Sequence, residues 1–97
     1  MPRLRRSLDR RLLFTEAAEL LLDIYDAGGK NVPLSELVVK SKVGRQSVYK
    51  YYRILAEKGL LEVVQETFPG RIYLTLTPRG KEIAEHLKKI EELYETT

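Results

Sequence analysis

The sequence predicts an α+β domain in which three helices precede a β-hairpin and a long helix ends the chain. The spacing of apolar residues predicts this class. Up to residue 58 they recur every three or four positions, as on the buried side of helices. Between residues 61 and 77 the period is two, as in strands, with a Phe-Pro-Gly turn in the middle. After Thr77-Pro78, a typical helix start, the helical spacing returns.

Composition indicates one small domain. The 97 residues suit a single domain, and 43% of them are apolar, but no apolar run is long enough to cross a bilayer or to belong to a signal peptide. We therefore expect a cytoplasmic protein without a membrane partner. The chain has no cysteine and only one histidine, His86, so neither a nucleophile–base pair nor a metal cluster can be assembled. We expect no enzyme activity and no cofactor, and a surface or interface role for His86.

Charge is distributed unevenly along this chain, whose net charge is +3. Residues 30–58 carry seven basic and two acidic side chains, residues 1–11 carry five arginines against Asp9, and residues 82–97 have five acids and two lysines. This asymmetry favours a polyanion as the partner of one face, and hence a nucleoid-associated protein. Charged residues make up 32% of the chain, against about 25% typically, and thermolabile side chains are few, which fits a thermophilic source.

The patterns divide the chain into three regions. Residues 1–14 form a basic arm or a helix, because the arginines suit an arm while leucines recur every four positions, at Leu4, Leu8 and Leu12. Residues 15–77 form the main domain, and residues 78–97 form the last helix. No internal repeat is evident.

The first helix of the main domain is predicted over residues 15–27. Thr15 suits the N-cap, acids occupy the first turn, and Gly28-Gly29 ends the helix. Its buried stripe is expected to be Ala17, Leu20, Leu21, Ile24 and Tyr25. Residues 31–33 are a short link that can form one β-bridge.

A helix-turn-helix follows. The second helix, residues 34–41, is expected to bury Leu37 and Val38, and residues 42–44 make the turn. The third helix, residues 45–58, begins after Gly44 as N-cap and ends at Gly59, which suits a left-handed C-cap. Its core face is predicted by the i, i+4, i+7 spacing of Val48, Tyr52 and Leu55.

The opposite face of the third helix is polar and basic. An α-helix fits the DNA major groove, and its N-terminal residues come closest to the bases. Arginine pairs with guanine and glutamine with adenine, whereas lysine and arginine also bind phosphates. We therefore expect DNA contacts from Arg45, Gln46, Ser47, Tyr49, Lys50 and Arg53. The alternative is a solvated polar face. Base stacking on the tyrosines is disfavoured, because Tyr49, Tyr51 and Tyr52 point in different directions.

The last helix carries an apolar seam with 4-3-4 spacing, formed by Ile83, Leu87, Ile90 and Tyr94. A helix of about 17 residues is about 25 Å long and would project beyond so small a domain. Because a wet apolar stripe is unfavourable, we expect this seam to form a homodimer interface. The leucines of residues 1–14 can join the same interface.

Two segments resemble a known family. They are residues 34–62, which end in AEKGLLE, and residues 74–87, which contain LTPRGKE. Both resemble winged helix-turn-helix regulators, especially small dimeric archaeal and MarR- or PadR-like ones. The resemblance implies that the third helix enters the major groove, that the hairpin is a wing touching backbone or minor groove, and that Lys42 and Arg71 flank the recognition helix. The wing turn, ETFPGR, has one basic residue, which argues against deep minor-groove insertion.

Together these patterns predict a homodimeric winged-helix protein that binds double-stranded DNA sequence-specifically, as a transcriptional regulator. Two alternatives stay open. One is a chromatin-like protein of low sequence specificity, and the other is a winged-helix module that binds another protein. The sequence leaves the operator, the direction of regulation and any small-molecule effector undefined.

Overall fold

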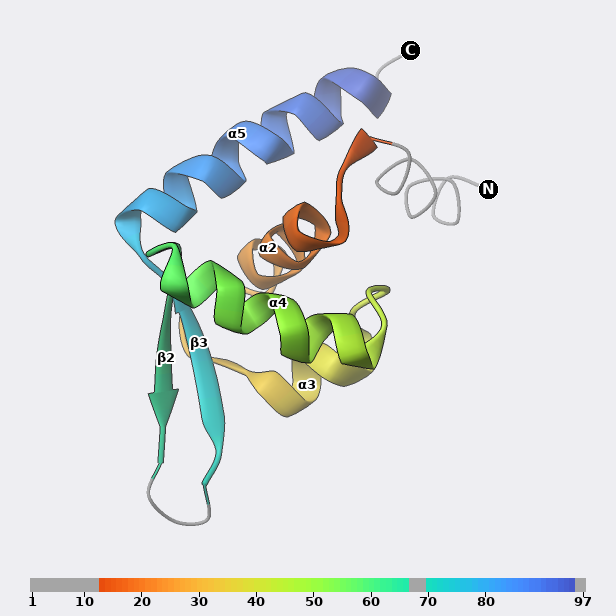
Figure 1. Cartoon of the computed structure of the whole chain (residues 1–97). Helices are drawn as coiled ribbons and strands as arrows, with labels where there is room; N and C mark the ends of the chain where they lie inside the picture. Colours follow the sequence, from red (N-terminus) through yellow and green to blue (C-terminus); the bar gives the residue numbers. More distant parts are fainter. Residues whose placement is uncertain (1–12, 67–69, 96–97) are drawn as a thin grey trace.

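The computed structural model describes residues 13–66 and 70–95, and these form four helices and a three-stranded antiparallel sheet (Figure 1). The α+β class and the long C-terminal helix are therefore confirmed. The elements in chain order are α2 (Glu16–Asp26), β1 (Val32–Pro33), α3 (Leu34–Lys40), α4 (Arg45–Glu57), β2 (Leu61–Gln65), β3 (Ile72–Leu76) and α5 (Pro78–Glu95). None of the described helices is long and apolar enough to span a membrane.

Helix α2 begins and ends as its sequence predicts. The Thr15 side chain caps the helix by accepting the Ala18 N–H at 3.3 Å. At the other end Gly28 and Gly29 both have positive φ, which glycine adopts at little cost. The Gly29 N–H bonds to the Ile24 carbonyl at 2.9 Å, and its own carbonyl accepts the Leu76 N–H at 2.9 Å. The turn after α2 is thus tied to the sheet.

The sheet has the strand order β1-β3-β2. The β-bridge expected in residues 31–33 is present as strand β1: Val32 pairs with Leu74 and Pro33 with Tyr73. Strands β2 and β3 form the hairpin, in a register that runs from Leu61 opposite Leu76 to Gln65 opposite Ile72. The hairpin turn includes residues 67–69, which lie outside the described residues.

The core lies between α2, α4 and the sheet, and the expected apolar stripes supply it. Leu20, Leu21 and Ile24 of α2 are buried, while Ala17 and Tyr25 are half-buried. Leu37 is buried in α3, with Val38 half-buried at its edge. The three residues expected to face the core from α4 are all buried: Val48, Tyr52 and Leu55.

The first turn of helix α5 contacts the segment that follows the C-terminal end of α4. The Thr77 hydroxyl donates to the Gly59 carbonyl at 2.7 Å and accepts the Gly80 N–H at 3.0 Å. Gly80 packs so closely that a Cβ there would collide with the Leu60 carbonyl. From this point α5 runs along α2, away from the hairpin (Figure 1). A glycine is therefore required where the last helix crosses the chain.

Candidate nucleic-acid interface

The turn between α3 and α4 is held in place by Ser41. Its hydroxyl donates to the Asp23 carboxylate of α2 at 2.6 Å and accepts the Val43 N–H at 3.0 Å. Val43 itself is buried, and the Gly44 carbonyl accepts the first hydrogen bond of α4, from Val48, at 2.9 Å. The start of α4 therefore has a defined position relative to α2.

The polar face of α4 is exposed, opposite its buried face. This is the arrangement that a helix needs to enter a groove while its other side packs on the core. Tyr49 is 43% exposed even though it is aromatic. The exposed residues of the expected set are Arg45, Gln46, Tyr49, Lys50 and Arg53.

Ser47 is placed differently from the rest of this set. Its side chain is half-buried, and its hydroxyl donates to the Glu16 carboxylate at 2.9 Å. This bond ties the first turn of α4 to the first turn of α2. In the free protein the Ser47 proton is thus already directed at α2.

The tyrosines of α4 support its basic residues. The Lys50 ammonium lies 5.2 Å from the centre of the Tyr51 ring, and the Arg53 guanidinium lies 5.8 Å from that of Tyr52. Both distances suit cation–π attraction. Tyr49 meets Tyr52 edge-on, with ring centres 6.4 Å apart and planes at 62°. The rings hold charged side chains and do not form a parallel stacking platform.

A groove of about 540 Å³ separates α4 from the wing. Tyr49 borders it on α4, and Arg71 and Tyr73 border it on the wing side. The first turn of α3 contributes Ser35 and Glu36. Ser35 and Tyr73 are candidate contacts that the sequence analysis missed. In the sequence Tyr73 alternates with the apolar residues Ile72 and Leu74, and this alternation is the signal that could have identified it.

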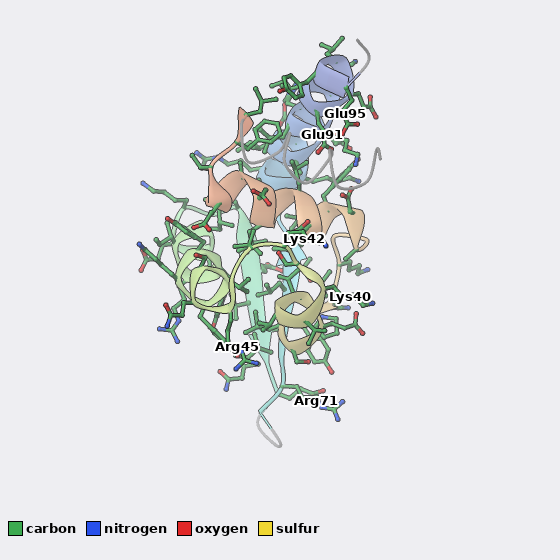
Figure 2. All side chains as sticks on the ribbon, turned by 90° about the vertical axis from the view of Figure 1, so that its right-hand side faces the viewer. Lys40, Lys42, Arg45, Arg71, Glu91 and Glu95 are labelled. Atoms are coloured by element: carbon green, nitrogen blue, oxygen red, sulfur yellow. The ribbon has the colours of Figure 1, made fainter. Side chains whose placement is uncertain are left out.

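The two residues expected to flank the recognition helix are both exposed. Figure 2 shows Arg71 and Arg45 toward the wing end of the molecule, whereas Lys42 lies nearer to α2. Glu91 and Glu95 of α5 lie at the opposite end (Figure 2). Two arginines thus lie toward the wing, whereas Glu91, at the far part of α5, is buried beside Lys88.

The apolar seam of α5 is covered unevenly. Ile83 and Leu87 are half-buried and pack against the core of their own chain, whereas Ile90 and Tyr94 are 45% and 40% exposed. Leu93 is not one of the four residues predicted to form the seam, and it is 70% exposed. Apolar surface is therefore concentrated on the last turns of α5. His86 is exposed on the same helix, and the expected contacts of Leu4, Leu8 and Leu12 lie outside the described residues.

Within residues 13–66 and 70–95, no three histidine, cysteine or acidic side chains come together as a metal site would require. The features gathered at the wing end are instead an exposed basic helix face, a groove beside it and an arginine on the hairpin.

No family model and no curated protein matches this sequence. Solved structures do match. AF1382 from Archaeoglobus fulgidus is 27% identical with a TM-score of 0.77, and the match covers 92% of this chain and 99% of that one. F-93 from SSV1 is 26% identical with a TM-score of 0.68, covering 84% and 91%. BpsR from Bordetella bronchiseptica, whose DNA binding is regulated by 6-hydroxynicotinic acid, is 22% identical with a TM-score of 0.70, covering 93% and 71%.

Proposed function

Because this chain shares the winged helix-turn-helix fold of those proteins, as its sequence predicted, we propose that it is a transcriptional regulator that binds double-stranded DNA as a homodimer. One observation carries the proposal. The first turns of α4 present arginine, glutamine and tyrosine to solvent from a helix whose opposite face is buried. That end of a recognition helix is the part that meets base edges.

Base reading belongs to the first turn of α4. Arg45 can donate two hydrogen bonds to the O6 and N7 atoms of guanine, and Gln46 can donate one to N7 of adenine and accept one from its N6 amino group. Lys50 and Arg53 lie further along α4, where the helix leaves the groove and passes the sugar–phosphate backbone. Their cation–π contacts restrain the two side chains before DNA arrives, which lowers the entropy lost on binding.

Phosphate binding extends across the groove to the wing. When α4 lies in the major groove and the wing lies over the backbone, a DNA strand has to pass along the groove between them. The groove offers the Arg71 guanidinium and the hydroxyls of Ser35 and Tyr73 as donors. Glu36 also borders it, but its carboxylate is 3.8 Å from Lys40, which offsets part of its repulsion of phosphate.

The homodimer rests on the exposed end of α5. Ile90, Leu93 and Tyr94 form an apolar surface on a helix end that continues past the core. Pairing two such ends buries these side chains and gives each complex two recognition helices. Two copies of α4 related by a two-fold axis would then read half-sites roughly 34 Å apart.

Regulation, rather than general coating of DNA, is favoured by the base-reading residues on α4. A chromatin-like protein would be expected to rely on phosphate contacts alone.

Selection of bound sequences from random duplex DNA tests the proposal. The purified protein should recover an inverted repeat, and the double variant R45A/Q46A should recover DNA without a motif, because its phosphate contacts remain. K81A, which alters an exposed lysine of α5, is the matched control and should recover the same repeat. A featureless pool from the wild type would contradict the regulator and support the chromatin-like alternative. Recovery of no DNA would contradict DNA binding altogether.

A further inference from the structure

Polar contacts tie helix α5 to the rest of the described chain at its base and at Lys88. The first is its base, where Thr77 bonds to Gly59 and Gly80 packs on Leu60. The second is Lys88, whose ammonium lies 3.0 Å from the Asp26 carboxylate of α2. Lys88 lies about 12 Å beyond Gly80 along the helix, at 1.5 Å per residue. Because a helix is rigid, contacts at these two separated positions fix the direction of α5 relative to α2.

The second attachment is partly shielded from water. The Lys88 side chain is only 25% exposed, and its ammonium also lies 3.5 Å from Glu91, a carboxylate that is almost fully buried. The apolar contacts between α5 and the core, made by Ile83, Ala84 and Leu87, favour burial but are not directional. The Lys88 ammonium also donates a hydrogen bond to Asp26, and because hydrogen bonds are directional, this bond favours one orientation among those that the apolar contacts allow.

Helix α2 connects this attachment to the helix-turn-helix. Asp26 holds Lys88, and Asp23, one turn earlier on α2, accepts the hydrogen bond from Ser41. Ser41 in turn accepts the N–H of Val43 just before α4. A chain of polar contacts through one rigid helix therefore relates the direction of α5 to the start of the recognition helix.

We propose that Lys88 is a positioning residue that sets the angle between α5 and the recognition helix, and thereby the spacing of half-sites that the dimer prefers. This inference rests on the proposed homodimer. The exposed side chains of Ile90, Leu93 and Tyr94 lie beyond Lys88 on the same rod. A change of angle at Lys88 displaces them relative to α4, and the two-fold axis doubles the effect on the separation of the two recognition helices.

A series of duplexes tests this role. Each carries the same two half-sites, taken from the selected repeat, and the number of base pairs between them is varied one at a time; a single half-site completes the set. The variants are K88M, which keeps the aliphatic stem, K88R, which keeps the charge, and D26N, which removes the ion pair from the other side. K89M is the matched control, because it removes the charge of the exposed neighbouring lysine.

The wild type should show a sharp optimum of spacing. K88M and D26N should bind the optimal duplex about 3- to 10-fold more weakly and show a broader optimum, which is the scale of one partly exposed ion pair in each protomer. Their affinity for the single half-site and their dimerisation should not change. K88R and K89M should behave like the wild type, since a purely electrostatic effect on DNA would also appear in K89M.

Three results would overturn the inference. K88M and D26N could keep the sharp optimum, or they could lose equal affinity on the half-site and on every repeat, which would indicate a general effect on folding or charge. In both cases the regulator itself would stand. A wild-type protein that binds the half-site and shows no preferred spacing would overturn the homodimer together with this role of Lys88.

Discussion

Ser41 donates a hydrogen bond of 2.6 Å to the carboxylate of Asp23, and this contact joins the helix-turn-helix to α2 across 18 positions of sequence. The same hydroxyl accepts the Val43 N–H, so one side chain both shapes the turn and anchors it. Hydrogen bonds to a charged group are stronger than those between neutral groups. Ser41 therefore both shapes the turn before α4 and attaches it to α2.

We expect Ser41→Ala to lower the free energy of unfolding by about 1–2 kcal/mol, because it removes one charge-assisted bond and leaves the Val43 N–H without its acceptor. Urea denaturation of the variant measures this loss. Ser35→Ala is the control, since Ser35 is an exposed serine at the start of the neighbouring helix, and it should change the stability by less than about 0.5 kcal/mol. Equal stabilities for the two variants would mean that Ser41 does not anchor the turn.

Affinity should divide between base reading and phosphate binding along α4. Arg45→Ala should lose about 1–3 kcal/mol on the selected repeat and much less on random duplex DNA. Arg53→Ala should weaken binding to both DNAs alike, because phosphates are present in every sequence. Titration of each variant against the two duplexes measures the difference. Losses of the same size on both DNAs for Arg45→Ala would remove Arg45 from the base-reading residues.

The salt dependence of binding should report how many phosphates the dimer neutralises. With some 6–10 phosphates, the logarithm of the affinity should fall with the logarithm of the salt concentration at a slope of about −5 to −9. Removing Arg71 should make this slope less steep, since one phosphate contact is lost in each protomer. Binding isotherms between low and moderate salt give the slope. A slope near zero would contradict an interface built on basic side chains.

Dimerisation should depend on the end of α5 and not on its whole seam. Ile90→Glu with Leu93→Glu should give a monomer with nearly unchanged stability, because both side chains are already exposed in the single chain. Its affinity for the full repeat should fall by about 10²-fold, since the two recognition helices are no longer linked. Sedimentation and titration on the full repeat and a half-site measure both effects.

The matched control is Lys89→Glu, which reverses the exposed charge next to Ile90 and should leave the dimer intact. Leu87→Glu should behave differently again and lower the stability of the monomer, because Leu87 packs on its own core. A wild-type protein that sediments as a monomer at micromolar concentration would contradict the proposed interface.

Local signals made much of the fold predictable. The Thr15 cap, the glycines after α2 and the Thr77-Pro78 start each act within a few residues, so their effect can be recognised in the sequence. The change of period from helix to strand is similarly local. Boundaries were shifted slightly where a side chain competes with the helix: α3 ends at Lys40, because Ser41 takes extended backbone angles and turns its hydroxyl to Val43.

Contacts between distant segments could not be predicted in the same way. The spacing of Ile83, Leu87, Ile90 and Tyr94 defines a stripe, but it does not say which part of the stripe its own domain covers. The bond between Ser47 and Glu16 and the ion pair between Lys88 and Asp26 join residues that are near only after folding. The need for glycine at position 80 likewise depends on where α5 crosses Leu60.

The placement of the basic side chains has a consequence for how the protein would approach DNA. Arg45 and Arg71 lie toward the wing end, whereas helix α5 carries five acidic and four basic side chains, which nearly balance (Figure 2). In the field of a DNA molecule such an uneven distribution would act as a torque that turns the wing end toward the duplex before contact.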